Sequence, residues 1–256
     1  MISTTDGHRY TRFLQKETKR TKRWGLNDHE NLEGKFRCSL FPVDSLAFRP
    51  ANSKFFFMAL AQNIPRLSEA DYLRSERQAE FRSEYFDGEV FAMAGGTRAH
   101  SLIATNLLRE VSSRLKTSDC VAYNTDLRVK VEATGLLTYP DVSVVCGAQR
   151  FLDEEEDTLL NPTVVIEVIS DSTEAYDRGK KFENYRQIPT CREYLLVSQK
   201  EPRIEQFIRQ PNGEWALKEA AGLDAEIKLP SLGIVLPLRE VFAKVQFAPA
   251  RLRTSA

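Results

Sequence analysis

A run of apolar residues broken by one acid constrains the fold of this chain more than any other feature. The segment TVVIEVIS covers residues 163–170, and Glu167 interrupts a run that is otherwise Val and Ile. A short apolar run rich in β-branched residues is typical of a strand buried on both faces of its sheet. Such a strand needs layers packed on both sides, which favours an α/β fold.

Glu167 places an ionisable carboxyl group at the centre of this strand. A lone buried carboxylate costs several kcal/mol unless it is paired or bound to a metal. Asp141 is a second unusual acid, because it stands between Pro140 and an alternating apolar strand. Two carboxylates on neighbouring strands can supply oxygen ligands to Mg²⁺ or Mn²⁺. The sequence therefore predicts a metal site, and the alternative is a salt bridge or hydrogen bond to a neighbouring strand.

The remaining pattern predicts a mixed α/β (α+β) domain with elements in the order αβββαβ and further short strands in the tail. The expected elements are a helix at 69–81 capped by Ser68, a hairpin SEYFDGEVFAMAGG turning at Asp87-Gly88, a helix from His100 to Leu115, strands at 127–131, 139–146 and 163–170, a helix at 177–188 and a strand at 192–197. The strands at 127–131 and 139–146 alternate in polarity, so we expect them to form a hairpin. The predicted fold is a central mixed sheet flanked by helices.

Residues 1–57 differ in character from the rest of the chain. They contain 11 Lys and Arg and 6 Asp and Glu, which leaves 25 and 30 for the remainder, so the head is basic and the body acidic. The head lacks a sustained apolar period, which predicts a disordered basic arm; upstream read-through before a start at Met58 is the alternative. We expect the folded domain at 58–256. Because its surface is not generally basic, any claim of DNA binding must rest on a site.

Composition excludes several other classes of protein. No apolar run approaches the roughly 18 residues needed to span a bilayer, and the N-terminus lacks a secretory signal, so we expect a cytoplasmic protein without a membrane partner. Cys38, Cys120, Cys146 and Cys191 are scattered without a CxxC pair, which favours reduced structural cysteines over a disulfide framework or a zinc site. Neither a phosphate-binding GxxxxGK loop nor a hydrolytic triad pattern is present.

The segment DRGKKFENYRQI can supply a cation beside the carboxylates. At about 100° per residue, the apolar residues Phe182, Tyr185 and Ile188 define the inner face of a helix. Lys181 falls within this face, whereas Lys180 points away. The alternative for Lys181 is a side chain that lies along apolar surface with its ammonium in solvent.

Several separated motifs, in order, resemble the Uma-two family of restriction-endonuclease-like proteins, which belongs to the PD-(D/E)xK nuclease superfamily. The segments that carry the resemblance are SEYFDGEVFAMAGG, His100, Pro140-Asp141, Ile166-Glu167-Val168, Asp177 and Lys181. The match spans about residues 66–243, nearly the whole body. It implies a restriction-endonuclease-like core.

The resemblance also implies roles for single residues. Asp141 corresponds to the Asp of the superfamily motif and Glu167 to its Asp or Glu, and both would bind the metal. The usual lysine two residues after the Glu is replaced by Ile169, so we expect the catalytic lysine at Lys181 on the following helix. Glu89 resembles a further acidic position and is a candidate third ligand; a solvated turn residue is the alternative.

Three more residues are candidates for contact with a substrate. His100 opens the long helix on its apolar side, where a general base is one interpretation and a partly buried structural histidine the other. Arg128 and Lys130 share one strand face with Asp126. That face is a candidate to line a groove for the DNA backbone, and an exposed strand face is the alternative.

These residues together predict an endonuclease that depends on Mg²⁺ or Mn²⁺ and hydrolyses phosphodiester bonds of DNA. A homodimer is a family expectation, since many enzymes of this class cut both strands as dimers. The alternative is a non-catalytic nuclease-fold module that binds DNA or a protein partner. Ile169 at the usual lysine position is the feature that favours this alternative.

Overall fold

The structure, a computed structural model, describes residues 66–170 and 172–247. Its strands are β1 (Ser83–Phe86), β2 (Glu89–Ala92), β3 (Cys120–Asn124), β4 (Arg128–Val131), β5 (Leu136–Thr138), β6 (Val142–Cys146), β7 (Thr158–Leu159), β8 (Val164–Ile169), β9 (Glu193–Ser198), β10 (Arg203–Arg209), β11 (Trp215–Ala221), β12 (Glu226–Leu229) and β13 (Ile234–Pro237). Its helices are α2 (Glu69–Glu76), α3 (Arg98–Arg114), α4 (Glu174–Tyr176), the π-helical turn η1 (Asp177–Lys181), α5 (Phe182–Tyr185) and α6 (Leu238–Val241). The expected arm at 1–57 and the boundary at Met58 lie outside the described residues.

The strands form two larger sheets and one separate hairpin. The six-stranded sheet has the order β11-β10-β9-β8-β6-β3, and the five-stranded sheet has the order β2-β1-β5-β4-β7. β12 and β13 pair with each other. Both sheets contain parallel and antiparallel neighbours, so the expected mixed α/β class is confirmed.

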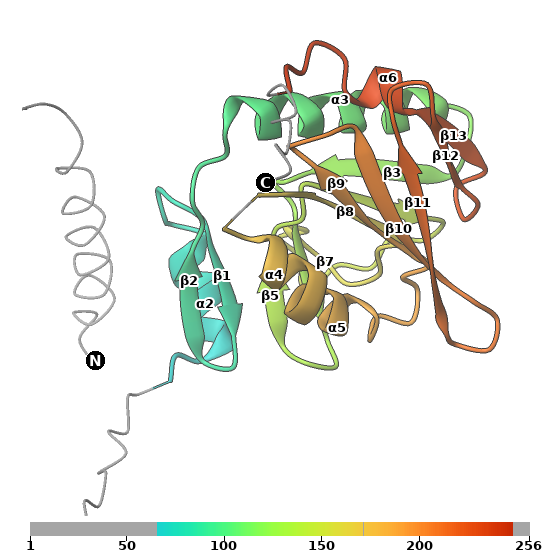
Figure 1. The fold of residues 1–256 in the computed structure, drawn as a ribbon. Coiled ribbons are helices and arrows are strands. Elements are labelled where there is room, and N and C mark those ends of the chain that lie inside the picture. Colours follow the sequence, from blue (N-terminus) through green and yellow to red (C-terminus); the bar gives the residue numbers. More distant parts are fainter. Residues whose placement is uncertain (1–65, 171, 248–256) are drawn as a thin grey trace, which may run out of the picture. The chain divides into compact units, whose positions relative to one another are not determined.

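The apolar run of the sequence is strand β8, and all six of its residues are buried. It lies inside the six-stranded sheet, parallel to β9 and antiparallel to β6. Its even-numbered residues pack into a core that includes α3, α6 and the β12–β13 hairpin (Figure 1). Val165 and Ile169 face the opposite core, which includes β4, β5 and α5. Because side chains alternate along a strand, Glu167 points into this second layer.

The prediction of one strand at 139–146 that forms a hairpin with 127–131 is wrong in part, because the strand begins only at Val142 and residues 139–141 belong to neither sheet. The partner of β4 is β5, whereas β6 pairs with β3 and β8 in the other sheet. The chain crosses between the sheets at Tyr139–Asp141, where Pro140 has no N–H to offer a ladder. This crossing places Asp141 where the two sheets are joined.

The local signals for helices and turns are confirmed. Ser68 caps α2 by accepting a hydrogen bond from the backbone N–H of Asp71, although the helix ends five residues earlier than expected. Asp87 and Gly88 have φ angles of 49° and 82°, as a tight hairpin turn between β1 and β2 requires. The apolar stripe of α3 is buried through Ile103, Leu107, Val111 and Leu115.

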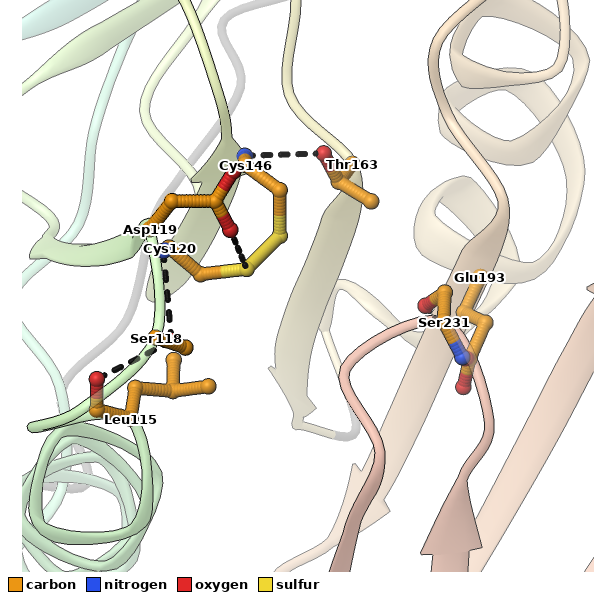
Figure 2. The surroundings of a disulfide bond; sticks show 8 residues. All are labelled: Leu115, Ser118, Asp119, Cys120, Cys146, Thr163, Glu193 and Ser231. Carbon is orange, nitrogen blue, oxygen red and sulfur yellow. Dashed lines mark hydrogen bonds between the residues drawn. A yellow bond between two sulfur atoms is a disulfide. The ribbon is translucent and has the colours of Figure 1, made fainter.

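The prediction of reduced cysteines is wrong for one pair. Cys120 and Cys146 form a disulfide across the β3–β6 ladder, where they stand directly opposite each other. Figure 2 shows this bond with the hydroxyl groups of Ser118 and Thr163, which accept hydrogen bonds from the two cysteine amides. The cysteines are 26 residues apart, so only strand pairing brings them together. Cys191 is free and buried, as expected.

Across the part of the chain that the structure describes, no helix combines the length and the apolar character needed to cross a membrane.

Candidate active site

Lys181 lies at the centre of a buried group of acids. Its ammonium nitrogen is 3.1 Å from carboxylate oxygens of both Glu84 and Glu167. Asp177 contacts the same nitrogen at 3.4 Å. All four side chains are at most 10% exposed, so the charges face each other with little screening by water. We refer to Glu84, Glu167, Asp177 and Lys181 as the carboxylate–lysine cluster.

The helical segment after β8 explains how two members of the cluster point the same way. Asp177 and Lys181 are the first and last residues of the π-helical turn η1, and both are buried. π-helical turns inside helices occur frequently at functional sites. The prediction that Lys181 faces inward and Lys180 outward is confirmed, because Lys180 is exposed and lines a separate shallow pocket of about 500 Å³.

The acid that the β1–β2 hairpin contributes to the cluster is Glu84. Glu84 is buried, contacts Lys181 and accepts a hydrogen bond from the hydroxyl of Thr138. Glu89, the acid chosen from the sequence, is exposed at the start of β2. Sequence reasoning missed Glu84 because it precedes the turn in a polar strand, where an acid is ordinarily solvated.

Asp141 stands beside the cluster with its own partners. Its Oδ2 atom accepts a hydrogen bond from the backbone N–H of Val168 at 2.7 Å and lies 3.2 Å from Nε2 of His100. Val168 follows Glu167 on β8, so this bond anchors one predicted ligand to the strand that carries the other. His100 is held at the start of α3, whose cap is Thr97. The structure therefore brings together Asp141, Glu167, Lys181 and His100.

The pKa values of the cluster reflect burial and the crowding of charges. The pKa of the Glu167 carboxyl is raised to about 8, because burial and the nearby Asp177 and Asp141 raise it more than the Lys181 ammonium lowers it. Burial also raises the pKa of Asp177. Burial lowers the pKa of Lys181, but the three surrounding carboxylates raise it more, so the net pKa lies well above its usual value. Lys181 therefore keeps its proton, while the pKa of the Glu167 carboxyl lies above its usual value.

His100 also has a shifted pKa. Its hydrogen bond to Asp141 raises the pKa of the imidazole, and burial opposes this shift. A histidine with a raised pKa is charged over more of the neutral range, which favours its contact with the Asp141 carboxylate.

The two cations of the predicted DNA-facing strand face are not exposed, although Asp126 is. Arg128 is 2% exposed, and its guanidinium pairs with Asp157 and donates to the hydroxyl of Thr158. Lys130 pairs with Glu69 on α2. The alternation of β4 reads as an exposed face in isolation, but the elements packed over the strand use both cations to hold the domain together. The prediction of a backbone-binding role is therefore wrong for Arg128.

No group of three or more His, Cys, Asp or Glu side chains that could hold a metal ion occurs within residues 66–170 and 172–247. Lys181 stands at the point on which Glu84, Glu167 and Asp177 converge. In this arrangement the ammonium offsets part of the charge of the three acids.

Fold and site together define a mixed α/β protein in which β8, β1 and the helical turn η1 bring a buried cluster of acids around one lysine. The sequence profile of the Uma2 family, described as "Putative restriction endonuclease", matches residues 69–239. The chain belongs to this family, which confirms the resemblance found in the sequence.

Two relatives from the cyanobacterium Synechocystis sp. (strain PCC 6803) support this assignment. The uncharacterized protein slr1290 is 35% identical over 185 residues, covering 72% of this chain and 95% of its own length. The uncharacterized protein sll1609 is 32% identical over 168 residues, covering 66% of this chain and 95% of its own length.

A solved structure has the same fold. It is described as a "putative nuclease belonging to DUF820" from Anabaena variabilis ATCC 29413, and it matches with a TM-score of 0.53 at 20% identity. The match covers 66% of this chain and 93% of that structure. The family description and the shared fold suggest a nuclease.

Proposed function

We propose that this protein is a divalent-metal-dependent endonuclease that hydrolyses phosphodiester bonds of DNA. The observation that carries the proposal is the junction of Asp141, Glu167 and Lys181 at one place in a fold shared with a nuclease family. These three residues come from the crossing segment, the central strand and the following helix. Two acids that can hold a metal, with a cation beside them, suit phosphate chemistry at a metal.

The donor set fits Mg²⁺ or Mn²⁺ better than a metal that needs a full protein cage. Mg²⁺ is usually held by one or two carboxylates, with waters and substrate phosphates completing its shell. Asp141 and Glu167 would hold the ion. Glu84 shares the Lys181 contact with Glu167, whereas Glu89 is exposed. A bound ion would supply an acidic water for attack on phosphorus and a counter-charge for the phosphate.

The chain's own residues would prepare this reaction. The Val168 amide and His100 hold Oδ2 of Asp141 and so fix the orientation of its carboxylate. Lys181 keeps its charge because three acids surround it. An ammonium at this position can orient the attacking water or stabilise charge on the phosphate.

Cleavage by the full-length chain tests the proposal. Supercoiled and linear DNA would be incubated with the protein in Mg²⁺, Mn²⁺ or EDTA, beside Asp141→Ala as the inactive control. We expect nicking or cleavage with either metal, none in EDTA and none with the variant. DNA binding without cleavage in any metal would favour the non-catalytic module. Ile169 at the usual lysine position is the feature that supports this alternative.

The oligomeric state is part of the same proposal. A homodimer would place two sites on opposite strands of a duplex. Light scattering of the chain with and without DNA would measure it, and products with both strands cut would be expected of a dimer.

A further inference from the structure

Two buried hydroxyl groups belong to the carboxylate–lysine cluster. Tyr185 is fully buried on α5, and its hydroxyl donates to Oε1 of Glu167 at 2.9 Å. Thr138 is fully buried at the end of β5, and its hydroxyl donates to Oε1 of Glu84. Each hydroxyl therefore reaches the same oxygen that Lys181 contacts at 3.1 Å.

These contacts matter because a glutamate carboxylate is not fixed by its own torsion angles. The terminal χ3 torsion of Glu is broad, so rotation exchanges its two oxygens freely unless neighbours hold one of them. Within the described part of the chain, the hydrogen bonds and ion pair of Glu167 converge on Oε1. An ionised carboxylate accepts at both oxygens. Oε2 is thus the oxygen left for an incoming ligand.

We propose that Tyr185 and Thr138 are positioning residues of the metal site. The Tyr185 hydroxyl holds one oxygen of Glu167, and the Thr138 hydroxyl holds one oxygen of Glu84. The other oxygen of each carboxylate is thereby oriented to bind a divalent ion. Neither hydroxyl touches the ion or the substrate. This inference rests on the proposed function, because it requires a divalent ion to bind at Glu167.

The two residues approach the acids from different layers. Tyr185 extends from the helix on the inner face, where its ring packs 5.3 Å from that of Tyr194. Thr138 ends the strand that precedes the crossing at Asp141. One hydroxyl comes from a helix and the other from a sheet, while Lys181 contacts both acids, so losing either hydroxyl removes one of the contacts that hold its acid.

Substitutions at these positions can separate the hydroxyl group from the packing. Tyr185→Phe removes one oxygen and keeps the ring. Thr138→Val keeps the shape and removes the hydroxyl, whereas Thr138→Ser keeps the hydroxyl and removes a methyl group. Tyr72→Phe is the matched control, because Tyr72 is equally buried and donates to the backbone carbonyl of Ser83 rather than to a carboxylate.

The experiment measures Mn²⁺ affinity of the full-length protein without DNA. Electron paramagnetic resonance of free Mn²⁺ gives the Kd, and circular dichroism checks that each variant is folded. Loss of a residue that orients a metal ligand typically weakens metal affinity by about 10- to 100-fold. We expect this loss in Tyr185→Phe and Thr138→Val. Thr138→Ser and Tyr72→Phe should bind Mn²⁺ as the wild type does.

The possible outcomes are distinct. If the wild type binds Mn²⁺ and Tyr185→Phe and Thr138→Val bind it as tightly, the positioning role is overturned and the proposed function stands. Equal weakening in Thr138→Ser or Tyr72→Phe would overturn it too, since packing rather than the hydroxyl would then matter. A wild type that binds no Mn²⁺ overturns the proposed function itself. Should Tyr185→Phe fail to fold, the Val and Ser variants of Thr138 decide the question.

Discussion

Replacing Lys181 with Met tests whether its ammonium balances the charge of the buried acids. Met keeps an unbranched stem of similar length and removes the charge. The nitrogen that is lost lies 3.1 Å from Glu84 and Glu167 and 3.4 Å from Asp177. Removing one partner from a buried ion pair costs about 3–5 kcal/mol. At about 2–4 °C per kcal/mol for a domain of this size, we expect the metal-free variant to melt roughly 6–20 °C below wild type.

The loss should depend on pH in a defined direction. Burial has already raised the pKa values of Glu167 and Asp177, and without the ammonium both rise further. A carboxyl group whose folded pKa is raised binds more protons in the folded state, so its stabilising contribution is complete at low pH and is lost as pH rises through the folded pKa. The wild-type Glu167 pKa is about 8, so the gap between Lys181→Met and wild type should widen from about pH 7 to about pH 9.

Thermal unfolding of the full-length chain in EDTA, followed by circular dichroism at both pH values, measures this effect. Lys180→Met is the control, because Lys180 is the neighbouring residue, carries the same charge and is exposed. Surface substitutions of this kind usually change stability by less than about 0.5 kcal/mol. In a cleavage assay only Lys181→Met should lose rate, on the order of 10²-fold. Equal melting temperatures for the two variants, or a loss that does not change with pH, would refute the reasoning.

Three further perturbations give distinct results. Asp141→Asn should lose most of the roughly 1.4 kcal/mol that Mg²⁺ at ten times Kd gives the wild type, and a variant that keeps the full Mg²⁺-dependent gain would count against the metal site. Reducing the Cys120–Cys146 bond, which spans 26 residues, should lower stability by about 3 kcal/mol, and the Cys120→Ser variant should melt at one temperature with or without dithiothreitol. Deleting residues 1–57, which lack an apolar period, should leave the melting temperature nearly unchanged, and a large drop would mean that they pack on the domain.

Residues whose burial is visible in local patterns were placed correctly. Glu167 lies within an apolar run, and the apolar composition of that run predicts that the whole strand is buried. Helical periodicity likewise assigns Lys181 to the inner face, since the positions of its apolar neighbours fix the phase of the helix. The Asp87-Gly88 turn follows from backbone preferences of two residues alone.

Residues whose surroundings depend on a partner distant in the sequence were not placed correctly from the sequence. Glu84 reads as a solvated acid until the pairing of β1 with β5 brings it beside Thr138 and Lys181. Arg128 reads as surface until Asp157 and the elements over its strand enclose it.

The sequence by itself determined that this chain would form a mixed α/β domain with an acid in its central strand and a lysine facing it. Those features arise from periodicity and from the cost of burying charge, which act within one element. Only the tertiary structure decided which other groups meet there. The crossing at Pro140 carries β5 and β6 into different sheets and sets Asp141 against Val168. The strand register and the passage of the chain from one sheet to the other depend on contacts between distant segments, and no local pattern fixes them.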